Sequence, residues 1–495
     1  MLSLFMAVWS SPTLLAQCAQ DCVGANSFFG NDAGANNSGT SNSFFGSEAG
    51  QANTTGRDNS FFGRRAGLNN TTGISNSFFG RNAGNGNTTG SDNSFFGREA
   101  GLSNTEGAAN SFFGRDAGRN NITGDNNSFF GRNAGLSNTE GAANSFFGRD
   151  AGLNNTMGTA NSFFGRDAGR DNTTGLSNSF FGTSAGLNNT EGEDNSFFGR
   201  DAGRNNTTGV NNSFFGRDAG RNNTTGVNNS FFGRDAGSSN SAGVNNSIFG
   251  TSAGENNMTG GNNSFFGTFA GIANTTGFHN SFFGNSAGIA NTTGESNTFI
   301  GQSAGNRNVR GSGNVAIGRG AGPTSANFDV DQRLYIDVDL ETFLLGNDDP
   351  LIYGEFENDF VRINGTFEVT AGLTNPSSVK LKDRFSTVAP TLILEKINAL
   401  DIAEWSYKRD PAVRHIGPTA ESFYEAFGLG TGGDNISTID ADGVSLVAIQ
   451  ALTAELTKKD QEIKNLTEDS VLKAQRIGEL EDRLARIESL LIDKK

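Results

Sequence analysis

The chain has 495 residues, with 69 Gly and 43 Phe but only 2 Trp and 4 Tyr. These proportions exclude an average globular composition and indicate a repeat protein. The formal net charge of −15 leaves no diffuse basic surface, so we expect neither nucleic acid nor a membrane held by basic patches as a partner.

Residues 1–16 are predicted to be a signal peptide, because a short apolar run ends in small residues near Ala16. The usual basic start is missing, and a buried N-terminal helix is the competing interpretation. No later run approaches the ~20 apolar residues of a membrane helix, so we expect no membrane insertion after the signal is removed. The expected location is secreted or on a bacterial cell surface, or in a virion-like fibre if the protein is of phage origin.

The two cysteines, Cys18 and Cys22, would lie at the new N-terminus after cleavage. A local or interchain disulfide is compatible with an oxidising compartment. Two thiols without a nearby histidine do not predict a metal site, since the two histidines are His279 and His415. We expect no cofactor.

Residues 26–322 contain eighteen units, which start at Asn26, Asn42 and Asn59 and continue to Asn314. Every step is seventeen residues except the first, which is sixteen. Such regular spacing indicates one structural unit per repeat, with equivalent residues stacked in ladders. Three Gly in each unit argue against a helix, so each unit is predicted to form a short strand and turns, making one coil of a β-solenoid.

Each unit carries two adjacent phenylalanines, for example Phe214 and Phe215 in the unit "NSFFGRDAGRNNTTGVN". Adjacent strand residues point to opposite faces, so the two rings need two different apolar environments. One ring is predicted to fill the coil interior beside Ala219. A row of the other rings would form a large exposed apolar patch, so we expect it to be buried between chains, most simply around a three-fold axis.

Other recurring positions have structural explanations. Asn212 and Asn223 recur in nearly every unit, and stacked amide ladders or turn caps account for them without a ligand. Rows of Thr would suit an ice-binding face, but the positions equivalent to Thr224 and Thr225 hold Glu, Met, Val or Arg in other units. An ice-binding surface is therefore kept only as an alternative.

After the repeats, residues 323–375 alternate apolar and polar side chains and are predicted to be a small β connector. From Thr391 the pattern becomes helical, in "TLILEKINALDIAEWSYK" and then "TAESFYEAFGLG". Residues 449–492 have the heptad periodicity of a coiled coil, with Ile and Leu mixed at both seam positions, which permits a trimer. The a sites are Ile449, Leu456, Ile463, Ser470, Ile477, Leu484 and Leu491, and the d sites are Leu452, Lys459, Leu466, Lys473, Leu480 and Ile487.

Two parts of the sequence resemble known fibre proteins. The last coil, "NVAIGRGAG", is similar to the "NxxAIG" coils of trimeric autotransporter adhesin heads and phage tail-fibre shafts, which implies a trimeric parallel β-roll or a related fibre. Roughly residues 376–470, with "NPSSVKLKDRF", "RHIGPTAESFYEAFG" and "DADGVSLVAIQAL" in this order before a coiled coil, resemble the endosialidase-type intramolecular chaperone of phage tail spikes and fibres. Residues 376–448 are accordingly expected to be the chaperone and self-cleaving peptidase domain. The expected fold is thus a mainly β solenoid, a β connector, a small α+β chaperone domain and a helical coiled coil.

The chaperone resemblance also implies chemistry. In that family a serine opens a short motif with lysines, the domain trimerises the fibre, and cleavage at the serine releases the domain. Ser377 is the implied nucleophile and Lys382 the implied base, with Ser378 as the alternative nucleophile. A lysine held in an apolar interface can have a pKa low enough to take a serine proton. His415 is interpreted as a packed structural residue rather than a third catalytic member.

Two functions therefore stay open. The first is an exported homotrimeric fibre whose C-terminal domain is a trimerisation chaperone and a single-turnover serine endopeptidase that acts on its own chain. The second is a surface adhesin or ice-binding module, in which the repeat shaft binds and the C-terminal domain is a permanent trimerisation anchor. The sequence does not identify a surface or glycan receptor for either one.

Overall fold

The computed structural model describes residues 24–323, 329–338, 350–364, 367–368, 377–408, 410–430 and 432–492. The predicted signal peptide, Cys18 and Cys22 lie outside these ranges. The chain forms two compact units, Met1–Glu368 and Val369–Lys495. Among the described helices, none is both long enough and apolar enough to span a membrane.

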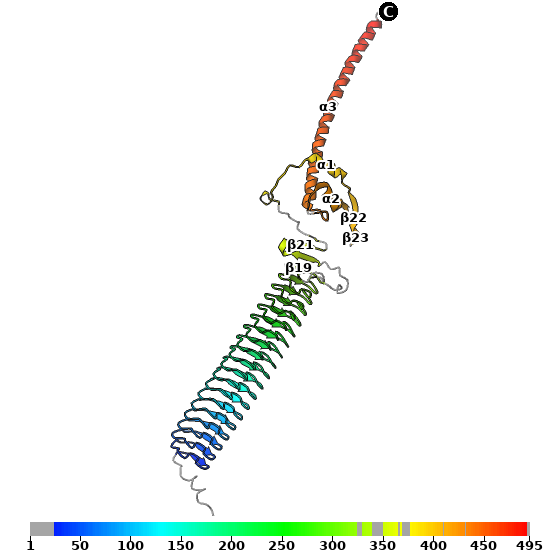
Figure 1. Cartoon of the computed structure of the whole chain (residues 1–495). Coiled ribbons are helices and arrows are strands. Elements are labelled where there is room, and N and C mark those ends of the chain that lie inside the picture. Colours follow the sequence, from blue (N-terminus) through cyan, green and yellow to red (C-terminus); the bar gives the residue numbers. More distant parts are fainter. Residues whose placement is uncertain are drawn as a thin grey trace, which may run out of the picture. The chain divides into compact units, whose positions relative to one another are not determined.

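The first unit is a β-solenoid, as predicted, in which each repeat forms one coil with one three-residue strand (Figure 1). The strands are β1 (Ser27–Phe29), β2 (Ser43–Phe45), β3 (Ser60–Phe62), β4 (Ser77–Phe79), β5 (Ser94–Phe96), β6 (Ser111–Phe113), β7 (Ser128–Phe130), β8 (Ser145–Phe147), β9 (Ser162–Phe164), β10 (Ser179–Phe181), β11 (Ser196–Phe198), β12 (Ser213–Phe215), β13 (Ser230–Phe232), β14 (Ser247–Phe249), β15 (Ser264–Phe266), β16 (Ser281–Phe283), β17 (Thr298–Ile300) and β18 (Val315–Ile317). Each strand pairs in parallel with the next, and equivalent residues are aligned, as in Phe214 with Phe231.

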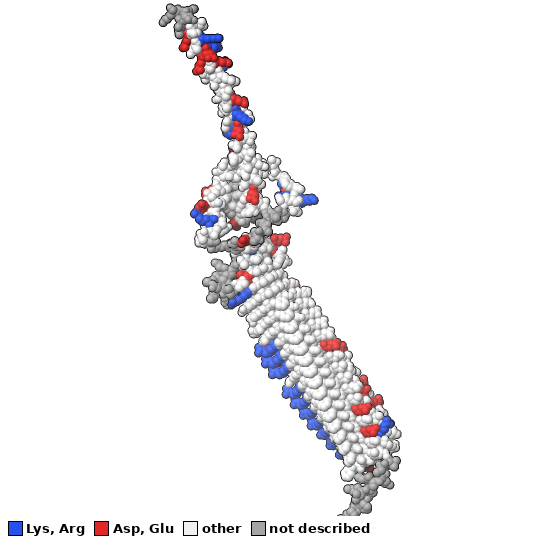
Figure 2. All heavy atoms as spheres, turned by 180° about the vertical axis from the view of Figure 1, so that it is seen from behind, with Lys and Arg blue, Asp and Glu red and all other residues white. Residues whose placement is uncertain are grey.

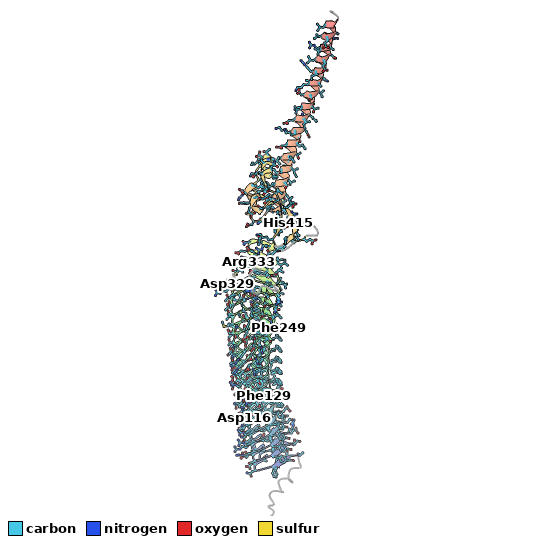
Figure 3. All side chains as sticks on the ribbon, turned by 90° about the vertical axis from the view of Figure 1, so that its right-hand side faces the viewer. Asp116, Phe129, Phe249, Asp329, Arg333 and His415 are labelled. Carbon is cyan, nitrogen blue, oxygen red and sulfur yellow. The ribbon has the colours of Figure 1, made fainter. Side chains whose placement is uncertain are left out.

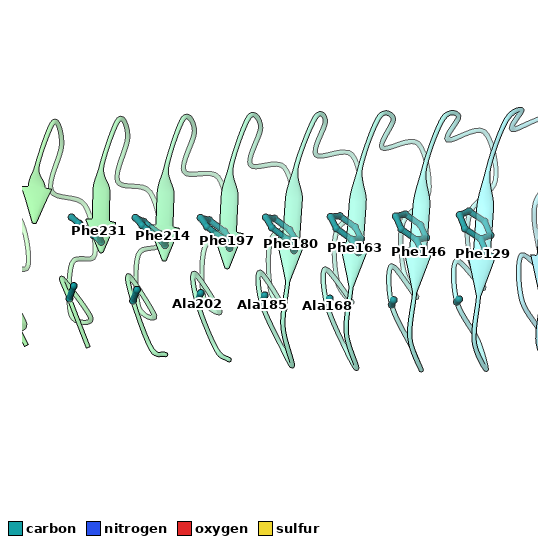
Figure 4. Close-up of a cluster of buried hydrophobic side chains, with 14 of the residues drawn as sticks. Phe129, Phe146, Phe163, Ala168, Phe180, Ala185, Phe197, Ala202, Phe214 and Phe231 are labelled. Atoms are coloured by element: carbon teal, nitrogen blue, oxygen red, sulfur yellow. The ribbon is translucent and has the colours of Figure 1, made fainter. Parts of the chain in front are cut away.

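The first phenylalanine of each pair forms the core (Figure 4). Phe214 and Ala219 are fully buried, which confirms the predicted interior pairing. The Phe214 ring stacks between Phe197 and Phe231, with ring centroids 4.8 Å away on either side. This spacing equals the distance between neighbouring strands, so one flat ring fills one coil.

Two glycines in each unit are required by this packing. Gly220 has φ +56° and lies against the Phe214 ring, which a Cβ at this position would overlap. Gly216 has φ +143°, and a Cβ there would run into the backbone of Gly233 in the next coil. Between them Asp218 adopts φ +59°, a left-handed conformation that Asp and Asn tolerate better than most residues.

Two buried rows of asparagine tie the coils together, and both confirm the predicted amide ladders. The Asn229 backbone N–H donates to the Asn212 side-chain oxygen at 3.1 Å, while the Asn212 amide donates to the Gly226 carbonyl at 2.8 Å. In the second row, Asn223 donates to the Asn206 side-chain oxygen at 2.8 Å. These contacts recur at each coil, so nearly every polar group of the interior has a partner.

We predict that Phe214→Ala destabilises its part of the solenoid by about 3–5 kcal/mol, the usual cost of deleting a buried ring and leaving a cavity. Hydrogen exchange of the amides in the neighbouring coils measures this loss, because repeat proteins open locally. Phe214→Ile is the matched control, since Ile248 occupies the same position in β14, and it should lose less than half as much. Equal protection in wild type and Phe214→Ala would contradict the assigned core.

The predicted β connector forms strands that close the end of the solenoid. Strand β19 (Arg333–Ile336) pairs in parallel with β18, and β20 (Ile352–Glu355), the short 3-10 helix η1 (Phe356–Asn358) and β21 (Phe360–Ile363) follow as an antiparallel pair. Tyr335 is packed against the last coil, and its burial raises its pKa to about 12. The connector therefore covers the core where the repeats stop.

The second unit contains η2 (Val379–Leu381), α1 (Pro390–Ala399), the hairpin β22 (Ala403–Tyr407) and β23 (Asp410–Gly417), α2 (Ala420–Phe427) and α3 (Thr438–Ile492). The prediction of a helix through residues 391–408 was wrong after Ala399. Residues 403–407 alternate their side chains across a strand, and Trp405 pairs with His415. The long helix was predicted correctly, although it begins eleven residues before position 449.

Candidate functional site

The implied dyad, Ser377 and Lys382, is brought together by η2. This single 3-10 turn reverses the chain between the two residues, so that Lys382 Nζ donates to Ser377 Oγ at 2.7 Å. The distance is within the range that proton transfer between a nucleophile and its base requires. Pro376, on the other side of the expected cut, lies outside the described residues.

The two adjacent serines have different roles in the structure. The Ser378 side chain caps η2 by accepting from the Lys380 backbone N–H at 3.3 Å. Ser377 instead has the lysine ammonium as its partner. Geometry therefore favours Ser377 over Ser378 as the group that Lys382 could activate.

The segment around the dyad is exposed in the single chain and carries many apolar side chains. Val379, Leu381 and Phe385 are each 70–71% exposed. Ser377 and Lys382 are exposed as well. In this state the lysine is in contact with solvent, and an apolar environment for it would have to come from another chain.

His415, which is labelled in Figure 3, lies on β23 and contacts two aromatic side chains. Its ring stacks on Trp405, with centroids 4.7 Å apart and planes at 27°, and it meets the edge of Tyr407. Beside it, Arg414 forms an ion pair with Glu404 across the hairpin. These contacts give His415 a packing role, in agreement with the sequence interpretation.

Helix α3 carries an apolar seam that, over most of its length, no residue in the described part of the chain covers. The ten apolar members of the predicted a and d positions, defined here as the α3 seam, are each 53–68% exposed. They are Ile449, Leu452, Leu456, Ile463, Leu466, Ile477, Leu480, Leu484, Ile487 and Leu491. Only the start of the helix packs within the unit, where Val444 and Ala451 are buried and α1 lies against it.

The second phenylalanine of each pair forms a continuous row along the outside of the solenoid. Phe215 lies 4.7 Å from Phe198 and from Phe232, with the ring planes nearly parallel. The rings cover one another's faces and leave their edges to solvent, so most are half-buried rather than fully exposed. Stacking within one chain thus accounts for part of the burial that the sequence analysis assigned to partner chains.

The Thr rows are partly occupied by the fold itself. The hydroxyl of Thr224 donates to the carbonyl of Ser241 in the next coil at 2.9 Å, and the equivalent Thr207 donates to Thr224. The neighbouring Thr225 faces solvent. Only the second Thr of each "TT" pair is therefore available to an external surface.

Sequence reasoning missed the arginines that follow "FFG" in most coils. They form a straight row on the turn after each strand, and their recurrence at seventeen-residue steps was the available signal. Comparison of the chain with protein-family models, with curated proteins and with solved structures finds no match.

Proposed function

We propose that this protein is an exported homotrimeric fibre, in which the solenoid is the shaft and the second unit sets three chains in register. The observation that carries the proposal is the α3 seam, ten large apolar side chains at heptad spacing that are more than half exposed. A long helix gains most of its stability by packing its apolar face, and heptad spacing suits packing against equivalent helices. The half-buried outer Phe row supports the same assembly along the shaft.

The proposal extends to self-release by one proteolytic event per chain. In it, Lys382 first loses a proton to solvent, and its neutral amine nitrogen then takes the proton of Ser377 Oγ, which attacks the carbonyl carbon of residue 376. The carbon–nitrogen bond to residue 377 breaks, the nitrogen receives the proton, and water hydrolyses the resulting ester. The 2.7 Å contact and the exposed apolar side chains around it support this step, because assembly would remove water from the lysine.

Sedimentation equilibrium of the purified protein at several concentrations tests the assembly. We expect a mass of three chains that stays constant over the micromolar range. A concentration-independent mass of one chain would overturn the proposal. Intact mass spectrometry of the same sample reports whether the chain has been cut before residue 377.

The second candidate function is a surface adhesin with a permanent C-terminal anchor, in which the shaft is the binding face. It is favoured by the long straight rows of equivalent side chains that the solenoid presents to solvent. A full-length trimer that never loses residues 377–495 would select this function over a self-releasing fibre.

A further inference from the structure

A row of arginines runs along one edge of the solenoid (Figure 2). It occupies the residue after "FFG", and we call it the arginine row. Its members between residues 64 and 234 are Arg64, Arg81, Arg98, Arg115, Arg132, Arg149, Arg166, Arg200, Arg217 and Arg234. Because the strands are in register, neighbouring members are one coil apart along the fibre, and the row is interrupted within this span only at Thr183.

The turn that carries this row is strongly basic although the chain is acidic. Over residues 64–238, the five positions that follow "FFG" in each coil hold fifteen arginines and seven acidic residues. The acids are also the less exposed partners. Side chains of the arginine row that form ion pairs are 48–58% exposed, whereas the carboxylates they contact are 11–27% exposed. The charge that faces solvent on this edge is therefore positive.

Nine of the ten members of the arginine row, all except Arg64, lie within ion-pair distance of a carboxylate. Arg217 Nε lies 3.2 Å from Asp218 of its own coil, and its Nη2 lies 3.9 Å from Asp235 of the next coil. Arg200 makes the same two contacts with Asp201 and Asp218. The row is thus ordered along the fibre, and its guanidinium groups stay half-exposed for a second anion.

The choice of arginine points to recognition rather than to solubility. No lysine occurs before Lys380, so apart from His279 every basic residue of the shaft is an arginine. Lysine would serve equally well for solubility, whereas the planar guanidinium binds carboxylate and sulfate groups with two parallel hydrogen bonds.

We infer that the arginine row docks an extended anionic polysaccharide, one that carries carboxylate or sulfate groups along its length. The inference rests on the proposed function only in requiring that the shaft is exposed outside the cell. A thin flexible chain fits a row one side chain wide. A nucleic acid duplex would extend beyond the row to the acidic side chains that Figure 2 shows towards the other edge of the solenoid.

Binding of the purified protein to heparin, polygalacturonate, neutral dextran and single-stranded DNA tests the inference, measured by biolayer interferometry over a range of salt concentrations. Polygalacturonate carries only carboxylates, whereas heparin carries sulfates as well, so the comparison shows whether carboxylates alone are sufficient for binding. The loss variant replaces Arg115, Arg132, Arg149 and Arg166 by Gln, and its matched control replaces the same four by Lys. The gain variant, Thr183→Arg, fills the gap in the row.

We expect wild type to bind one or both acidic polysaccharides, with an affinity that falls as salt rises, and not to bind dextran. The Gln variant should bind about tenfold more weakly with a shallower salt dependence, while the Lys variant should retain part of the affinity. Thr183→Arg should bind about twofold more tightly, a result that misfolding cannot produce.

Three results would overturn the inference. The first is equal binding by wild type and a folded Gln variant, the second is binding to dextran, and the third is a preference for single-stranded DNA over both polysaccharides. If the Gln variant does not fold, an unchanged affinity of Thr183→Arg for the acidic polysaccharides would also overturn the inference. Sedimentation of the same samples separates the two proposals. A trimer that does not bind acidic polysaccharides would refute only the proposal that the arginine row binds them. A monomer that binds acidic polysaccharides would refute only the proposal of a trimer.

Discussion

Ser377→Ala and Lys382→Ala are each expected to leave the chain intact, whereas the assembled wild type should separate into a shaft ending at residue 376 and a fragment of residues 377–495. Removing either half of such a pair slows acyl transfer by about 10⁴-fold or more. The 2.7 Å contact between the two side chains is the structural basis. Time-resolved intact mass spectrometry after purification measures the conversion.

Two neighbouring residues of the same turn, Ser378 and Lys380, provide the matched controls for this experiment. Ser378→Ala removes a helix cap, and Lys380→Ala removes an equal charge from the same turn, but neither touches the Ser377–Lys382 contact. Both variants should still be cut. Loss of cleavage in Ser378→Ala alone would show that Ser378, not Ser377, is the nucleophile. If wild type forms trimers of full-length chains, self-release would be refuted, but the proposed trimer would stand.

The double substitution Leu466→Asp with Leu480→Asp should convert the trimer into single chains. Both side chains belong to the α3 seam and are 68% and 55% exposed in one chain, so assembly would have to bury two carboxylates in an apolar interface. Desolvation of unpaired charges is costly enough to prevent association at micromolar concentration. Sedimentation equilibrium gives the mass, and circular dichroism checks the helix content.

The matched control is Val471→Asp with Leu472→Asp. These two side chains lie on the same helix, are 54% and 67% exposed, and fall outside the a and d positions. The control should remain a trimer. If the control dissociates and the seam variant does not, the helices associate through a different face from the one proposed.

The sequence analysis was most successful where a pattern is repeated. Seventeen-residue spacing indicated a stacked coil, and the rule that adjacent strand residues point to opposite faces predicted one ring of each pair inside and the other outside. The structure shows that the inner ring is the first of the pair, Phe214. It was less successful where a short apolar segment has no repeat to support it. Residues 403–407 were expected to continue a helix, but aromatic pairing across the hairpin, with Trp405 on His415, stabilises a strand instead.

The candidate dyad could be named from the sequence only through a family resemblance. Lys382 is five positions after Ser377, and the 3-10 turn at Val379–Leu381 brings their side chains into contact. No spacing rule predicts such a turn. The arginine row was missed for a different reason, because a formal net charge of −15 averages over the chain and conceals a basic strip on one edge.

The asparagine ladders have a consequence for how fibres of this kind can change their length. Each coil makes the same hydrogen bonds to the coil before it and the coil after it, so a whole unit could be inserted or lost by unequal recombination without any new contact. Residues 195–211 and 212–228 are identical, as expected of a recent duplication. The length of the solenoid could therefore evolve in steps of one coil, while the closing strands and the second unit stay unchanged.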